Sequence, residues 1–357
     1  MTSQRRQRDR FPSKLRSRMV DIFAIISAAI IFFSICLEAE GASSLTKVVI
    51  AHASMNARTS LLWIAQGQGF FAKNGVEAKL IFMSRGPILI ASLAAGDVDI
   101  GLAGGTAVLG AAVGGLDLRA VATFTSRFLN NLVVRPGINS ANDLRGKRYG
   151  VSSLGGTLWM GAMLWLEHLG LDARRDNIRF LVIGDQTLLS QALETGIIDA
   201  TALDSAFSLK LRPKGFSVLG DFSQVNLPIM SVAIVVKKDY INEHSATLQN
   251  VLKALIESQA FTLAPKNKTT VIETLMKHLR ISDPAVAEEG YRDIIRGLDR
   301  KPYPLVEGLR NIQRLAEIRD PRVAKINVED LIDSRFVRKL DESSFIDGAY
   351  SAYERKQ

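Results

Sequence analysis

SLAAGDVDI, residues 92–100, is followed one hundred positions later by ALETGIIDA, residues 192–200. Both stretches have the pattern small–Leu–x–x–Gly–x–β-branched–Asp–apolar, which is typical of a helix that stops at a glycine and leads into a strand. The apolar segments that begin each half, near residues 48 and 148, keep the same spacing. The repeat therefore predicts two similar lobes, whether it arose by duplication or by convergent packing of helices on strands.

Strand-like and helical segments alternate through both halves. The first half predicts strands at 47–51, 76–82, 98–102 and 118–125, with helices at 60–73, 87–95 and 106–113. The second half predicts strands at 148–152, 178–183, 198–203 and 216–219, with helices at 157–169, 188–195 and 205–211. Alternation of this length predicts an α/β fold in which helices cover both faces of a mainly parallel sheet.

Two strand-like segments, 131–136 and 231–236, are the expected crossings between the lobes and hence the hinge. Beyond residue 239 the pattern is almost wholly helical, and we assign this tail to the back of lobe one. Its expected helices span 246–264, 267–280, 284–297 and 304–317. The expected domains are residues 42–130 with 237–357 for lobe one and residues 131–236 for lobe two.

The N-terminus has the pattern of an export signal, which we place at residues 1–41. Seven Lys and Arg residues precede an uncharged, largely apolar run from Ile22 to Leu37, and Ala39-Glu40-Gly41 provides a small-x-small cleavage pattern. An uncleaved membrane anchor is the alternative. The single cysteine, Cys36, lies inside this segment, so the mature chain has no thiol for disulfides, metal ligation or nucleophilic catalysis.

The composition favours a folded binding protein over several other classes. Hydrophobic residues make up 47% of the chain and charged residues 23%, which argues against wholesale disorder. The net charge is +9, but without residues 1–41 it falls to +6 and forms no dense basic stripe, so nucleic-acid binding is disfavoured. The four histidines lack metal-ligand spacing, and neither a phosphate-binding loop nor a Gly-x-Ser-x-Gly elbow occurs. We therefore expect no catalysis, no metal and no cofactor.

Candidate binding residues lie in loops that follow the predicted strands. Ligands of open α/β sheets bind at the carboxyl ends of the strands, where helix N-termini suit anions and hydrogen-bond acceptors. Gly104-Gly105-Thr106 and Ser153 to Thr157 are the loops that we favour most, although Ser, Thr or Asp at such positions also simply caps a helix. The full candidate set is Ser54, Asn56, Arg58, Arg85, Gly104, Gly105, Thr106, Ser126, Ser153, Gly155, Gly156, Thr157, Asp185 and Asp204.

The charged and aromatic candidates have alternatives of their own. Arg58, Arg85 and Arg127 can clamp a carboxylate, sulfonate or phosphate with paired N–H groups, or can be solvated surface residues. The two aspartates in the set can accept from a ligand amine or cap a helix. Trp159 can wall the cleft or pack in the core.

Further motifs run through residues 46–265. They are Ala65-x-x-x-Gly69-Phe70-Phe71 leading to Gly75-Val76, the two repeated stretches above, Ser140-x-x-Asp143-Leu144-Arg145-Gly146-Lys147, and Gly155-Gly156-Thr157. In this order and spacing the chain resembles bacterial ABC-transporter substrate-binding proteins of the sulfonate/nitrate/taurine type. These share an SsuA-like domain with the thiamine-pyrimidine synthases of the NMT1/THI5-like group.

The resemblance implies a type II periplasmic-binding-protein fold, with two Rossmann-like lobes joined by two crossover strands and here followed by a helical C-terminal extension. It implies a periplasmic monomer that carries a small anionic or heteroaromatic ligand to an ABC permease in the inner membrane. Arg85 stands where relatives often have a small residue. A membrane-tethered ligand sensor is an alternative, and a pyrimidine-synthase-like enzyme is disfavoured because that chemistry depends on a cysteine-rich segment.

Overall fold

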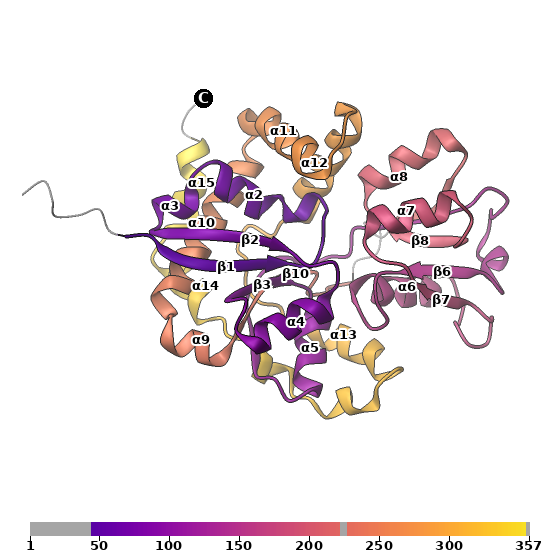
Figure 1. Cartoon of the computed structure of the whole chain (residues 1–357), viewed down its shortest axis with the longest axis horizontal. Helices are drawn as coiled ribbons and strands as arrows, with labels where there is room; N and C mark the ends of the chain where they lie inside the picture. The colour runs from indigo at the N-terminus through magenta and orange to yellow at the C-terminus, as the bar shows by residue number, and fades with distance from the viewer. Residues whose placement is uncertain (1–43, 222–226, 355–357) are drawn as a thin grey trace, which may run out of the picture. The chain divides into compact units, whose positions relative to one another are not determined.

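The computed structural model describes residues 44–221 and 227–354. Residues from Leu45 onward form one compact unit that contains two β-sheets (Figure 1). The export signal expected at residues 1–41 lies outside the described residues. Within the described ranges, no helix has both the length and the apolar character that crossing a membrane requires.

The first sheet has the strand order β2-β1-β3-β10-β4. Strand β1 lies second in this order and pairs in parallel with β2 on one side and β3 on the other, while β10 runs antiparallel between β3 and β4. The strands are β1 (Thr46–His52), β2 (Val76–Phe82), β3 (Ile100–Ala103), β4 (Leu118–Thr125) and β10 (Val232–Lys237).

The second sheet repeats this plan with the order β7-β6-β8-β5-β9. Here β6 pairs in parallel with β7 and β8, and β5 is the antiparallel strand between β8 and β9. The strands are β5 (Asn131–Val134), β6 (Arg148–Val151), β7 (Arg179–Val182), β8 (Ala200–Leu203) and β9 (Ser217–Asp221). The two-lobed α/β architecture expected from the repeat is confirmed.

The repeated aspartate accepts an equivalent backbone hydrogen bond in each lobe. The Asp99 carboxylate accepts a hydrogen bond of 2.7 Å from the backbone N–H of Val49 in β1, and the Asp199 carboxylate accepts one of 2.9 Å from the N–H of Arg148 in β6. The repeated glycines, Gly96 and Gly196, have φ of +83° and +75°, a left-handed conformation that glycine adopts without strain. The sequence repeat therefore reflects one helix–glycine–strand unit used twice.

The crossing segments differ from the expectation. Both 131–136 and 231–236 were placed in lobe two, but β10 lies inside the first sheet and only β5 lies in the second. The crossings are therefore the residues just before β5 and just before β10. The sequence of a short buried apolar strand does not indicate which of two sheets it joins, because either sheet can bury it equally well.

Helices cover the sheets of both lobes. Lobe one carries α2 (Ser60–Gly67), α3 (Phe70–Lys73), α4 (Gly86–Ala95) and α5 (Gly105–Val113), after the short turn η1 (Ala57–Thr59). Lobe two carries η2 (Ala141–Leu144), α6 (Thr157–His168), α7 (Gln186–Glu194), α8 (Ser205–Leu211) and η3 (Arg212–Lys214). The three tryptophans are buried, and Trp159 packs edge-on against Phe180, at 6.2 Å between ring centres, instead of walling the cleft.

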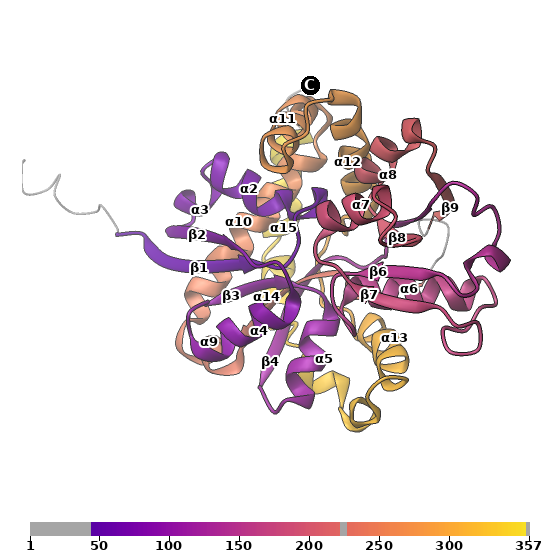
Figure 2. The same cartoon turned by 45° about the vertical axis from the view of Figure 1, so that its right-hand side comes forward.

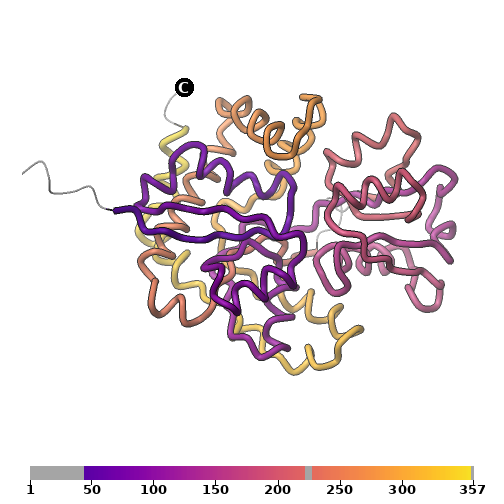
Figure 3. Tube along the Cα trace, in the orientation of Figure 1, coloured from indigo at the N-terminus to yellow at the C-terminus, as the bar shows by residue number. Residues whose placement is uncertain are grey.

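The C-terminal region is helical, as expected, but it does not pack only behind lobe one. While α10 covers α2 and α3, α12 contacts α8 of lobe two, and α13 contacts both α5 and α6 (Figures 2 and 3). The elements are α9 (Lys238–Glu243), α10 (Ser245–Leu263), η5 (Pro265–Asn267), α11 (Lys268–Leu279), α12 (Pro284–Gly297), α13 (Val306–Glu317), η6 (Pro321–Lys325), η7 (Val328–Leu331), α14 (Arg335–Glu342) and α15 (Phe345–Glu354).

Gly161 tests the packing of α6 on the crossing segment before β5. A Cβ placed on Gly161 would lie 1.9 Å from Cζ of Phe128, whereas one placed on Gly348 in α15 meets nothing within 4 Å. We expect Gly161→Ala to lower the free energy of unfolding by about 1–3 kcal/mol. Gly348→Ala should instead raise it by about 0.5–1 kcal/mol, because alanine is the better helix former. Chemical denaturation measures both, and equal effects would contradict the packing described.

Candidate functional site

A cavity of about 370 Å³ lies between the two lobes at the carboxyl ends of their parallel strands. Loops that follow β1, β2 and β3 line it from lobe one, and loops that follow β6 and β7 line it from lobe two. Eleven of the fourteen candidate residues line this cavity: Ser54, Asn56, Arg58, Arg85, Gly104, Thr106, Ser153, Gly155, Gly156, Thr157 and Asp185. That these residues bind a ligand stays a prediction.

The lobes meet across the cavity at the N-termini of α5 and α6. The hydroxyl oxygens of Thr106 and Thr157 lie 3.3 Å apart, and a Cβ placed on Gly104 would come within 2.7 Å of the Thr157 hydroxyl. The residues that precede both helices, Gly104 and Gly156, have no side chain to cap the first N–H groups. Two helix N-termini, each with a partial positive charge, therefore face one cavity.

Three candidate residues do not line the cavity. Gly105 is a packing residue, because a Cβ there would lie 2.9 Å from the side chains of both Leu309 and Ile312 in α13. The backbone N–H of Ser126 donates to the Asp299 carboxylate at 2.8 Å. The third, Asp204, is buried beside the cavity and faces Arg58 instead. Local sequence could not separate these roles, because the partners come from distant helices.

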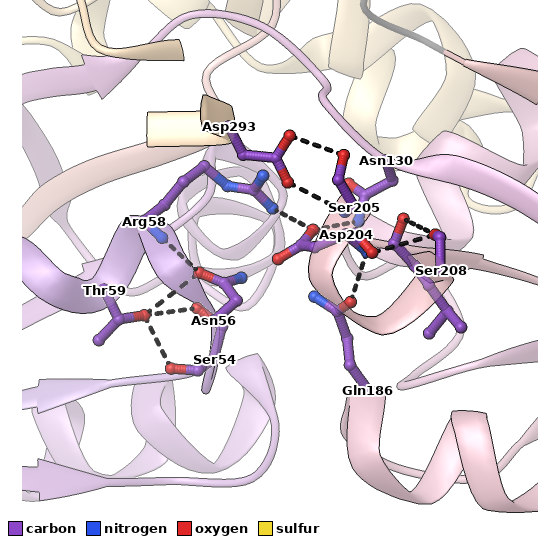
Figure 4. Close-up of polar contacts among 11 residues, drawn as sticks. Ser54, Asn56, Arg58, Thr59, Asn130, Gln186, Asp204, Ser205, Ser208 and Asp293 are labelled. Carbon is purple, nitrogen blue, oxygen red and sulfur yellow. Dashed lines mark hydrogen bonds and ion pairs between the residues drawn. The ribbon is translucent and has the colours of Figure 1, made fainter. Parts of the chain in front are cut away.

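Arg58 and Asp204 form an ion pair between the lobes (Figure 4). The Nη2 of Arg58, on η1, donates to Oδ1 of Asp204 at 2.9 Å, and both residues are almost fully buried. Oδ1 also accepts from the side-chain amide of Asn130 at 2.6 Å, and the Asp204 backbone N–H donates to Gln186 at 2.7 Å. The guanidinium of Arg58 thus contacts the second lobe, so Arg58 is not a solvated surface residue, and its role as a ligand clamp stays a prediction.

A second carboxylate extends this pair. Asp293 on α12 accepts from the Ser205 hydroxyl at 2.7 Å and from the Ser205 backbone N–H at 2.9 Å, so it caps α8 from the C-terminal region. Asp204 precedes that helix but makes no side-chain capping bond. We call Arg58, Asn130, Asp204, Ser205 and Asp293 the interlobe latch. The sequence held no local signal for Asp293, which lies in the middle of an amphipathic helix.

Burial changes the protonation of a carboxylate in the latch. Desolvation and the neighbouring Asp204 raise the pKa of Asp293 to about 7, although its hydrogen bonds from Ser205 and the charge of Arg58 oppose the shift. Nε and Nη1 of Arg58 and Oδ2 of Asp204 are buried without a hydrogen-bond partner among the described residues. The latch is therefore only partly satisfied, and its net charge depends on the protonation of Asp293.

The remaining charged candidates have mixed outcomes. Asp185 caps α7, since its carboxylate accepts from the N–H groups of Thr187 and Leu188 at 2.9 and 3.0 Å, which agrees with the capping interpretation. Arg85 lines the cavity and is exposed. Arg127 is exposed and does not line it.

Sequence reasoning missed six polar residues that line the cavity: Ser84, Asn130, Ser152, Gln186, Ser231 and Arg319. Gln186 directly follows the candidate Asp185, and Asn130 directly precedes the first crossing strand. No sequence pattern pointed to Arg319, which follows α13. Apolar side chains complete the wall, among them Met55, Pro87, Ile90, Leu102, Leu158 and Val232. Among the described residues, no cluster of His, Cys, Asp and Glu is arranged to hold a metal ion.

Sequence comparison identifies related proteins. A family model described as NMT1/THI5 like matches residues 56–268. A Brucella abortus protein that is provisionally named a binding protein is 31% identical over 146 residues, which are 41% of this chain and 44% of that protein. The match thus spans less than half of the relative's length.

Solved structures share the fold at low identity. The alkanesulfonate-binding protein SsuA from Xanthomonas axonopodis pv. citri has 19% identity and a TM-score of 0.66 over 81% of this chain and 98% of that one. The nitrate-binding protein NrtA from Synechocystis PCC 6803 has 15% identity and a TM-score of 0.67 over 84% and 89%. A Candida albicans protein described as having the generic periplasmic binding protein fold has 16% identity and a TM-score of 0.64 over 81% and 97%. The expected fold class is confirmed.

Asp293 predicts how stability changes with pH. Its pKa is about 7 in the folded chain and about 3.9 in an unfolded one, so the folded chain binds the additional proton between these values. The stability that this group contributes is present below about pH 4 and is lost as the pH rises through 7, with a slope of at most roughly 1.4 kcal/mol per pH unit. We expect Asp293→Asn to flatten the decline in unfolding free energy between about pH 4 and pH 7.

Denaturation at several pH values measures this difference against wild type. Glu273→Gln is the control, because Glu273 is an exposed carboxylate on the neighbouring helix α11. A decline that is as steep in Asp293→Asn as in wild type would show that another group is responsible.

Proposed function

The chain belongs to the NMT1/THI5-like family, and we propose that it is the solute-binding component of an ABC importer. In this role it captures a small ligand between its lobes in the periplasm and delivers it, as a monomer, to a permease in the inner membrane. The observation that carries the proposal is the cavity itself, which both lobes line at the carboxyl ends of their parallel strands. This is where open α/β sheets bind their ligands.

The size and lining of the cavity favour an organic ligand that is anionic or heteroaromatic. About 370 Å³ lies at the lower end of the roughly 300–1,000 Å³ typical of sites for organic molecules, and an inorganic anion would fill little of it. The two uncapped helix N-termini offer N–H groups to a negatively charged group or a ring acceptor. Apolar side chains such as Ile90, Leu102 and Val232 suit the rest of the ligand.

The chemistry of the lining residues supports binding without catalysis. The carboxylate that lines the cavity, Asp185, already accepts two N–H bonds as a helix cap. The hydroxyl groups of Thr106 and Thr157 face each other and have no histidine or lysine among the lining residues to activate them. The groups at the cavity can therefore hold and desolvate a ligand, which is what transport requires.

Closure is the proposed mechanism of capture. The ligand first binds the loops of one lobe, and the other lobe then brings its helix N-terminus to complete the contacts and exclude water. The contacts between the lobes, the Thr106–Thr157 approach and the interlobe latch, form only when the lobes are together. Ligand binding and closure are therefore coupled, and each stabilises the other.

A thermal-shift screen tests the proposal. The compounds are alkane- and arenesulfonates, carboxylates, nitrate and pyrimidines, and a binder at 100 times its dissociation constant should add about 2.7 kcal/mol of stability. We expect Thr106→Ala and Thr157→Ala each to weaken that binder by about tenfold, as loss of a hydrogen bond in a buried site does.

Thr187→Ala is the matched control, because Thr187 is exposed at the start of α7 and does not line the cavity. Unchanged affinity in both Thr106→Ala and Thr157→Ala would place the ligand elsewhere. The absence of any binder in the whole screen would count against the transport role.

A further inference from the structure

The segment that follows α13 reaches the cavity from outside the region that the family model matches. That match ends at residue 268, whereas Arg319 lines the cavity. Helix α13 is held between the lobes, since Leu309 and Ile312 pack over Gly105 and Arg314 pairs with Glu167 of α6 at 3.1 Å. Arg319 therefore follows a helix that contacts both walls of the site.

The guanidinium of Arg319 lies over the loop that leads into α6. A Cβ placed on Gly155 would lie 2.9 Å from Nη1 of Arg319, so a larger residue there would displace the arginine. Gly155 has φ of +77°, which also favours glycine at this position. The uncapped N-terminus of α6 begins two residues later, at Thr157. The arginine and the helix N-terminus thus put positive charge on the same side of the cavity.

Arg319 differs from the neighbouring arginines in making no close ion pair with a described residue. Arg310 pairs with Glu329, Arg314 with Glu167, and Arg322 with Asp320 at 2.7 Å. The side chain of Arg319 makes no ion pair or hydrogen bond with any described residue, although its charge also acts on the adjacent carboxylate of Asp320. The adjacent carboxylate is instead held by two nitrogens of Arg322. An arginine at a cavity whose adjacent carboxylate is held by another arginine can form paired hydrogen bonds with the acid group of a ligand.

We propose that Arg319 is a specificity-determining residue that binds the acid group of an organic ligand, together with the backbone N–H groups at the start of α6. Carboxylates and sulfonates share the planar or trigonal set of oxygens that a guanidinium recognises through paired N–H groups. The apolar residues of the cavity then contact the uncharged body of the ligand. This inference rests on the proposed function and narrows its ligand to an organic acid.

Isothermal titration of the full chain tests the assignment with defined probes. The probes are hexanoate, benzoate, hexanesulfonate and benzenesulfonate, with hexanamide and benzamide as uncharged counterparts. We expect wild type to bind at least one acid and to prefer it to its amide. Arg319→Gln should weaken that acid by about tenfold or more and leave the amide unchanged, and Arg319→Lys should recover part of the loss.

Arg310→Gln is the matched control, because Arg310 is an exposed arginine on α13 that does not line the cavity and whose partner is Glu329. It should leave acid binding within about twofold of wild type, as expected for a surface ion pair. Thermal unfolding of Arg319→Gln without ligand should match wild type, since the Arg319 side chain is exposed and makes no bond that folding needs.

The outcomes separate the inference from the function on which it rests. Acid binding that Arg319→Gln leaves unchanged would overturn the role of Arg319 and preserve the solute-binding function. Binding of pyrimidines or amides but of no acid would overturn the ligand class and also preserve that function. Failure of every probe and every pyrimidine to bind would overturn both.

Discussion

The ion pair between Arg58 and Asp204 is the contact on which the arrangement of the two lobes depends. Each residue follows a strand, β1 in one lobe and β8 in the other, so the pair can form only when the carboxyl ends of the two sheets face each other. Both side chains are almost fully buried. Removing one partner leaves the other charge buried and unpaired, which typically lowers the free energy of unfolding by about 3–5 kcal/mol. The pair therefore contributes mainly to the orientation in which the lobes meet, and it adds little net stability.

The incomplete hydrogen bonding of the latch agrees with a contact that opens and closes. Two nitrogens of Arg58 and one oxygen of Asp204 have no partner among the described residues, so water can satisfy these groups better when the lobes separate. The coulombic gain and the desolvation penalty of a buried pair are of similar size. In the proposed mechanism of closure this pair therefore adds little net stability to the closed state, and a ligand that contacts both lobes can favour that state.

The fold could be predicted from the sequence because its signals are local. The repeated helix–glycine–strand unit has the same physical basis in both lobes, a left-handed glycine and an aspartate that binds the first strand. The loops that line the cavity follow from the rule that ligands bind at strand carboxyl ends. Eleven of the fourteen candidate residues line the cavity for this reason.

What the sequence missed depends on contacts between distant segments. Asp293 and Arg319 lie on or just after C-terminal helices whose patterns indicate only amphipathic packing, yet one caps α8 and the other lines the cavity. The sequence also did not indicate to which sheet β10 belongs, since an apolar strand fits into either of the two sheets. Solved structures with this fold and less than 20% identity include proteins described as binding sulfonates and nitrate, so the fold alone does not select the ligand.

A distance measurement between the lobes tests the central claim most directly. Spin labels on cysteines introduced at Glu77 in β2 and Arg179 in β7, both exposed, report the separation in a chain whose Cys36 is replaced by serine. Pulsed electron resonance should give one narrow distribution for the otherwise unaltered chain. Arg58→Ala combined with Asp204→Ala, which removes both partners of the pair, should add a longer distance. Identical distributions in the two proteins would contradict the role of the latch.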